Sequence, residues 1–91
     1  MLYGNVNEIT NNIEVKTYPN PTQNYINIDI NNPENKMATI DVFSIEGKKI
    51  ATYKKHGKQF SLDLSKLERG TYFLTYTIEN QSIGYSKVNK L

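Results

Sequence analysis

The side chains best suited to chemistry are few and scattered along this sequence. His56 is the single histidine, and it lies beside Gly57 in a polar run. A serine triad would need this imidazole as its base, yet nothing in the surrounding sequence resembles a nucleophile elbow. The sequence has no cysteine, so a zinc site would have one nitrogen ligand and no thiolate, which is not a typical zinc pattern.

The carboxylates offer no clearer reaction centre. Asp29, Asp41 and Asp63 each lie between apolar neighbours in alternating stretches, so we expect them to face solvent, and their spacing is not that of a calcium loop. No glycine-rich phosphate loop is present. A carboxylate pair meeting across strands stays open, because spacing alone does not test it. We therefore expect a protein that is not an enzyme and uses neither a metal nor a cofactor.

One stretch of the sequence is basic. It contains Lys48, Lys49, Lys54, Lys55, His56 and Lys58, with Tyr53 among them. Lysines around an aromatic ring are compatible with a nucleic-acid platform, but the formal net charge of the chain is only +2. Outward lysines on an edge strand also prevent sheets from pairing edge to edge. We favour this second interpretation and expect no nucleic-acid partner.

The length of 91 residues predicts one domain with one modest core. Residues 1–12 are polar and lack periodicity, which predicts a linker before a domain over 13–91. No run approaches the ~18 apolar residues of a membrane span, so we expect no membrane insertion. The start does not resemble a signal peptide. The domain is therefore either cytoplasmic or part of a longer precursor that carries its own export signal.

From Ile13 onward the apolar residues recur with a period of two, which indicates strands. The predicted strands cover 13–16, 25–30, 38–44, 48–53, 60–64, 72–78 and 83–89. The pattern predicts an all-β fold, an immunoglobulin-like antiparallel β-sandwich of about seven short strands. A helix-poor α+β fold is the alternative, with at most one helical turn over 64–69. In the last strand Ile83 and Tyr85 fall on one face and Val88 on the other, which predicts either a bulge between them or an edge strand with one half-exposed face.

Tyr18-Pro19-Asn20-Pro21 predicts a stiff corner between the two sheets. Proline fixes φ and has no N–H to donate, so neither proline continues a central strand. Asn20 is expected to close the turn with its own side chain. Such a rigid, exposed corner also loses little entropy on binding, so recognition by a partner is compatible with this structural role.

Three further residues are typical of turns in β-sandwiches. Gly47 supplies the tight connection of a hairpin between the third and fourth strands. Gly70 lies where the chain must turn sharply into a strand, which suits a residue that tolerates positive φ. Tyr72, two positions later, is typical of a tyrosine corner, whose buried ring donates its hydroxyl to backbone a few residues upstream.

These motifs, in this order, resemble the C-terminal sorting domains (type A) of the type IX, or Por, secretion system of Bacteroidetes. The matching pieces are YPNP at 18–21 with the strand at 25–30, IDVFSIEGKKI at 40–50, LDLSKLERGTY at 62–72 and YSKVNKL at 85–91. The resemblance covers roughly 13–91. This sequence has Gln23-Asn24 where an aspartate is common, and Asn89 lies between the apolar and basic positions of the last strand.

The resemblance implies a non-catalytic secretion signal fused behind a cargo protein. Components of the type IX translocon would bind the folded domain in the periplasm, and a sortase-like protease would then cut the linker within 1–12. The cargo would end at the cell surface or be secreted. The residues expected to mediate translocon recognition are Lys87, Val88, Asn89, Lys90, Leu91, Gly70 and Tyr72. An open edge of strand 83–89 would accept a partner strand, and Phe73 would supply an exposed anchor.

The runner-up is an immunoglobulin-like accessory module that binds carbohydrate or supports adhesion. Such a module would expose a row of aromatic rings on one sheet face, and Tyr53, Tyr76 and Tyr85 are the candidates. The exposure of these three rings separates the two functions.

Overall fold

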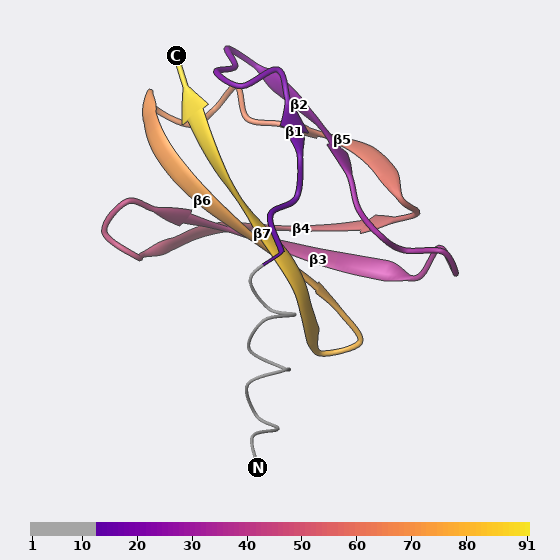
Figure 1. Ribbon diagram of the computed structural model, residues 1–91. Helices are drawn as coiled ribbons and strands as arrows, with labels where there is room; N and C mark the ends of the chain where they lie inside the picture. The colour runs from indigo at the N-terminus through magenta and orange to yellow at the C-terminus, as the bar shows by residue number, and fades with distance from the viewer. Residues whose placement is uncertain (1–12) are drawn as a thin grey trace.

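The computed structural model describes residues 13–91, so the predicted linker over 1–12 lies outside the described residues. Seven strands form two sheets, and every strand pair is antiparallel (Figure 1). The three-stranded sheet has the order β1 (Thr17–Tyr18), β2 (Tyr25–Asp29), β5 (Gln59–Asp63). The four-stranded sheet has the order β4 (Lys49–His56), β3 (Met37–Ser44), β6 (Gly70–Ile78), β7 (Gln81–Lys90). The predicted all-β sandwich is confirmed.

The core lies between the inner faces of the two sheets, because alternate residues of a strand point to opposite faces. In β2, Ile26 and Ile28 are fully buried while their neighbours are exposed. The buried hydrophobic residues are Val15, Ile26, Ile28, Ile30, Ala38, Ile40, Val42, Leu62, Leu64, Tyr72, Leu74, Tyr76 and Val88. The period-two pattern therefore predicted the core-facing residues correctly along β2, β3, β5 and β6.

The start of the domain differs from the predicted first strand. Only Thr17–Tyr18 pairs with β2, while Glu14 forms an isolated parallel bridge with Tyr85 of the other sheet. The predicted strand over 13–16 therefore does not form: it contributes only this bridge to the four-stranded sheet, and the first strand begins just after it, at Thr17. The stretch over 64–69, expected to hold at most one helical turn, contains no helix: Leu67 N–H donates to the Leu64 carbonyl in a simple turn.

The bulge predicted in the last strand exists, but it lies at Ile83. Tyr76 pairs with Gly84 and Thr77 pairs with Ser82, so Ile83 has no partner in β6. After this extra residue the parity of β7 changes, and Tyr85 points outward with 38% of its surface exposed. The expectation that Ile83 and Tyr85 share a face is therefore wrong. The bulge places Lys87 on the outer face and Val88 in the core.

Turn residues behave as their types predict. Gly47 has φ 90° and closes the β3–β4 hairpin by donating its N–H to the Ser44 carbonyl. The β6–β7 loop contains Glu79 and Asn80 at φ 52° and 66°, which matches the turn type that favours asparagine in two-residue hairpins. Asn32 is buried and its amide nitrogen donates to the carbonyls of Lys36 and Gly57.

The tyrosine corner is confirmed. The Tyr72 hydroxyl donates to the Glu68 carbonyl at 2.6 Å, and the side chain is 8% exposed. Gly70 starts β6 with φ 150°, the positive φ expected from its position at this sharp turn. The corner fixes the path of the chain into β6, the strand that pairs with β7.

Replacing Tyr72 by phenylalanine keeps the buried ring and removes only this hydrogen bond. We expect a loss of about 1 kcal/mol in the free energy of unfolding, because the Glu68 carbonyl loses its donor. Urea denaturation measures it, with Tyr25→Phe as the control because Tyr25 is 58% exposed. A Tyr72→Phe midpoint equal to that of the wild type would contradict the assigned role.

Candidate functional site

The corner between β1 and β2 lies against the last residues of β7, although the two segments are far apart in the sequence. Figure 1 shows the yellow end of β7 beside the indigo corner. Thr22 N–H donates to the Asn89 carbonyl at 2.9 Å, and Leu91 N–H donates to the Thr22 carbonyl at 2.8 Å. Thr22 is only 2% exposed, so this pairing closes the end of the sandwich.

Asn20 continues the pairing through its side chain. Its amide nitrogen donates to the Lys87 carbonyl at 2.8 Å, and its amide oxygen accepts the Asn89 N–H at 3.0 Å. The flanking prolines, Pro19 and Pro21, have no N–H of their own, so the asparagine amide supplies both a donor and an acceptor to the strand. The expectation that Asn20 closes its own turn is wrong: its side chain pairs with β7.

A second contact occupies the first half of the same edge. Val15 N–H donates to the Tyr85 carbonyl at 2.7 Å, and Tyr85 N–H donates to the Ile13 carbonyl at 3.0 Å. We call residues Ile13–Thr22 the lead-in segment. Together with the corner contacts, it bonds backbone groups of Tyr85, Lys87, Asn89 and Leu91. The predicted open edge over 83–89 is therefore wrong, because the same chain covers it.

Two consecutive hydrogen bonds between buried side chains and backbone hold the lead-in segment against the four-stranded sheet. The Tyr76 hydroxyl donates to Ser86 Oγ at 3.0 Å, and Ser86 Oγ donates to the Val15 carbonyl at 2.5 Å. Burial raises the pKa of Tyr76 to about 12, so the hydroxyl stays protonated and able to donate near neutral pH. Among residues 13–91, no buried side-chain nitrogen or oxygen lacks a hydrogen-bond partner.

Gly84 allows the lead-in segment to approach β7. A Cβ at this position would lie 2.7 Å from both the Ile13 carbonyl oxygen and Val15 Cγ2. Such a distance is too short for any side chain, so only glycine permits this crossing. Sequence reasoning missed Gly84, although a glycine inside an alternating strand is a recognised signal of close backbone approach.

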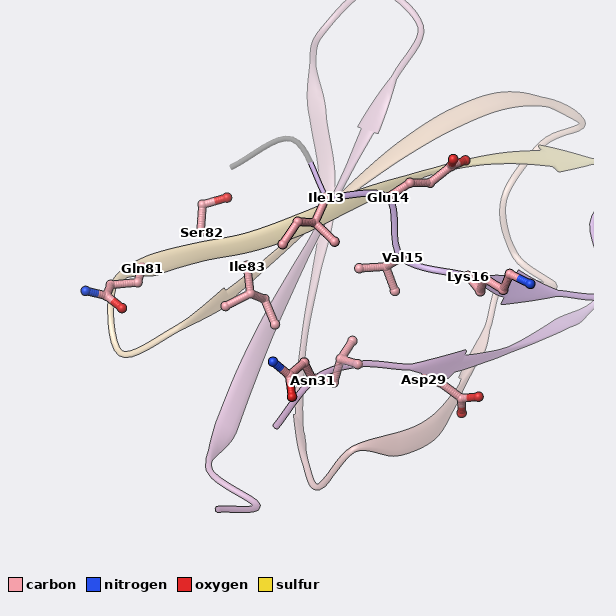
Figure 2. A pocket seen from close by; sticks show the side chains of 10 residues that line it. Ile13, Glu14, Val15, Lys16, Asp29, Asn31, Gln81, Ser82 and Ile83 are labelled. Carbon is pink, nitrogen blue, oxygen red and sulfur yellow. The ribbon is translucent and has the colours of Figure 1, made fainter. Parts of the chain in front are cut away.

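The crossing also forms a partly apolar hollow of about 410 Å³ between the lead-in segment, the end of β2 and the start of β7. Figure 2 shows the side chains of Ile13, Val15 and Ile83 gathered at this hollow. Ile13 is 51% exposed, whereas Val15 is buried and belongs to the core. Hydrophobic packing at Val15 therefore accompanies the backbone pairing.

The recognition residues predicted in the last strand divide into exposed and structural ones. Lys87, Asn89 and Leu91 are exposed, and Leu91 reaches 60%. Val88 is fully buried in the core. Lys90 is half-buried and its ammonium group donates to the Leu91 carbonyl at 3.2 Å. Only the first three are therefore exposed enough to contact a partner.

The other predicted site residues lie behind this strand. Gly70 pairs with Lys90 and Tyr72 pairs with Val88, so both support the end of β7. The Gly47 hairpin belongs to the same end of the sheet, because Ser44 pairs with Tyr72. On the lead-in side, exposed Pro19 and Pro21 line a shallow hollow with Leu91. We call Pro19, Pro21, Lys87, Asn89 and Leu91 the corner surface.

The structure places the three aromatic candidates of a carbohydrate site apart. Tyr76 is fully buried, and Tyr53 is half-buried with its hydroxyl donating to the Asp63 carbonyl at 3.2 Å. Burial raises the pKa of Tyr53, and the nearby Asp63 carboxylate adds to the effect. Only Tyr85 faces solvent, so the expected aromatic row is absent.

The three aspartates that were candidates for chemistry accept hydrogen bonds from neighbouring residues. Tyr18 donates to the Asp29 carboxylate, Thr52 donates to Asp41, and Ser65 N–H donates to Asp63. The Ser65 hydrogen bonds hold the pKa of Asp63 below its ordinary value. Over residues 13–91 no group of three histidine or acidic side chains could hold a metal ion, and none of the elements described there is a helix able to cross a membrane.

The fold is a small β-sandwich whose last strand is paired on both edges. The family model for the secretion system C-terminal sorting domain matches residues 16–89, and the chain belongs to this family. Members are non-catalytic secretion signals of the type IX, or Por, system. The protein is therefore directed to secretion or the cell surface and interacts with secretion machinery. A search of curated proteins found no match.

Asn20→Ala tests the side-chain pairing. We expect faster amide hydrogen exchange at Asn89 and a loss of about 1 kcal/mol in unfolding free energy, because two hydrogen bonds to the strand disappear. Exchange followed by NMR measures the effect residue by residue. Asn24→Ala is the matched control, since Asn24 is exposed and its backbone carbonyl accepts Leu64 N–H. Unchanged Asn89 exchange in Asn20→Ala would contradict the assignment.

Gly84→Ala tests the crossing. The new methyl group collides with backbone at Ile13, so the lead-in segment must move away from β7. We expect accelerated exchange of the Val15 and Tyr85 amides and faster limited proteolysis within the lead-in segment. Ser82→Ala, at an exposed position of the same strand, should leave both rates unchanged. Normal protection at Val15 in Gly84→Ala would show that the crossing tolerates a side chain.

Proposed function

We propose that components of the type IX translocon recognise this domain in its folded form at the corner surface. One observation carries the proposal: the lead-in segment already pairs with the outer edge of β7. A partner strand therefore has no free run of backbone groups to pair with at this edge. Recognition then depends on exposed side chains that the fold holds in place. Binding to such side chains loses little conformational entropy.

The chemistry of the corner surface favours an acidic and partly apolar partner. Lys87 is exposed and steers association with negative charge. Leu91 with Pro19 and Pro21 offers a small rigid apolar contact. Buried Val88 together with Gly70 and Tyr72 acts indirectly, by holding the strand that presents these side chains.

The rest of the export route follows from the same assignment. A cargo protein is fused ahead of the domain, crosses the periplasm and then reaches the cell surface or the medium. A sortase-like protease removes the domain by cutting within 1–12, the linker that precedes the sandwich over 13–91. Support comes from the family and from the lead-in segment: because Ile13–Val15 is bound to β7, a cut before Ile13 leaves the sandwich intact.

A reporter fused ahead of the domain tests recognition in a secreting host. Deleting Lys87–Leu91 should leave the reporter in the periplasm, but it also removes Val88 from the core. The sharper variant is Lys87→Ala with Leu91→Ser, because both side chains are exposed. We expect periplasmic retention of this variant with an unchanged unfolding midpoint.

Lys58→Ala is the matched control, since Lys58 is an exposed lysine of the β4–β5 loop. It should be exported like the wild type. Undiminished export of the Lys87→Ala, Leu91→Ser variant would remove the corner surface from the recognition step. Export after deletion of all five residues would refute the role of the last strand altogether.

A further inference from the structure

A second exposed surface lies on the outer face of the four-stranded sheet. Phe43 of β3 and Phe73 of β6 are direct cross-strand partners, and both point away from the core. Tyr85 of β7 lies on the same face, two residue pairs further along the β6–β7 ladder. Phe73 is 37% and Tyr85 38% exposed. Three aromatic rings therefore gather on a sheet face that nothing in residues 13–91 covers.

Lysines lie at both sides of the phenylalanine pair. Lys49 of β4 is the cross-strand partner of Phe43, and Lys87 of β7 is the partner of Phe73. The row across the sheet therefore runs from a lysine through two phenylalanines to a lysine. Asp41 is the acidic residue of the neighbouring row, and it lies 3.7 Å from the Lys49 ammonium group. Its negative charge is thus partly matched within the sheet.

The outer face of the three-stranded sheet has the opposite charge. Its outward strand residues are Tyr18, Tyr25, Asn27, Asp29, Gln59, Ser61 and Asp63. These include two aspartates and no lysine or arginine. The two outer faces therefore differ in charge: the four-stranded sheet carries Lys49 and Lys87 beside its aromatic rings, whereas the three-stranded sheet carries two aspartates beside exposed Tyr18 and Tyr25.

We infer that the aromatic, basic face (Phe43, Phe73, Tyr85, Lys49 and Lys87) is a docking surface for a protein partner with acidic side chains around an apolar centre. The inference rests on the proposed function and assigns this partner to the secretion machinery. Aromatic rings surrounded by polar residues are the usual anchors of protein interfaces. Lysines at both ends of the row select negative charge on the partner.

Two further observations support a protein partner at this face. Lys87 belongs to both the corner surface and the aromatic, basic face, so the two form one continuous region. Pairing at the β7 edge is closed by the lead-in segment, so a partner of β7 must contact side chains on this face or at the corner. Such a contact orders few side chains, because sheet residues are already fixed.

The test uses the same reporter fusion with Phe73→Thr and, separately, Lys87→Glu. Threonine suits the position because outward threonines flank it and favour strands. We expect each variant to slow export about tenfold, the effect of losing one interface anchor worth about 1.4 kcal/mol. The urea midpoint of Lys87→Glu should match that of the wild type, and that of Phe73→Thr should fall only slightly, because one cross-strand aromatic pair is lost while the domain stays folded. Tyr25→Thr, on the acidic face, is the matched control and should export normally.

A photo-crosslinking amino acid at Tyr85 identifies the occupant, with the same group at Tyr25 as control. Crosslinks from position 85 to an acidic protein of the secretion machinery support the inference. Crosslinks to a second copy of this chain, or to a glycolipid, would overturn it. Normal export of both Phe73→Thr and Lys87→Glu would also overturn it. If the unaltered fusion is not exported, the proposed function itself fails, so the two failures are distinguishable.

Discussion

Pairing between the lead-in segment and the outer edge of β7 is the interaction on which this structure depends. An edge strand exposes unsatisfied backbone groups and invites other strands to pair with it. Here Ile13, Val15 and Thr22 bond that edge through backbone, and Asn20 bonds it through its side chain. The start of the domain therefore covers the outer edge of its last strand, whose inner edge pairs with β6.

This constraint limits which groups of the domain are available to bind the secretion machinery. With the β7 edge covered, the proposed recognition uses exposed side chains that the folded sheet holds in place, on the corner surface and the adjoining aromatic, basic face. The buried residues of the same strand, Val88 and Ser86, hold that frame through packing and through the hydrogen bond to Val15. Under this proposal folding and recognition are coupled, because a change that loosens the lead-in segment also moves the side chains of the corner surface.

The sequence predicted those features that depend on local pattern. Period-two alternation identified the inward residues of β2, β3, β5 and β6, and the Gly70–Tyr72 spacing predicted the tyrosine corner. Alternation reports which face a residue occupies but not which strand lies beside it. The contact between Asn20 and Lys87 spans 67 residues, and no periodicity encodes it. The parallel contacts at Tyr85 and Lys90 were missed for the same reason, and with them the roles of Gly84 and Ser86.

Amide hydrogen exchange of the wild-type domain tests the central claim most directly. The N–H groups of Tyr85, Asn89 and Leu91 bond to the lead-in segment. If this pairing closes the edge, all three exchange much more slowly than in an unstructured peptide. Exchange of these three amides at unprotected rates, while the amides between β6 and β7 stay protected, would contradict it.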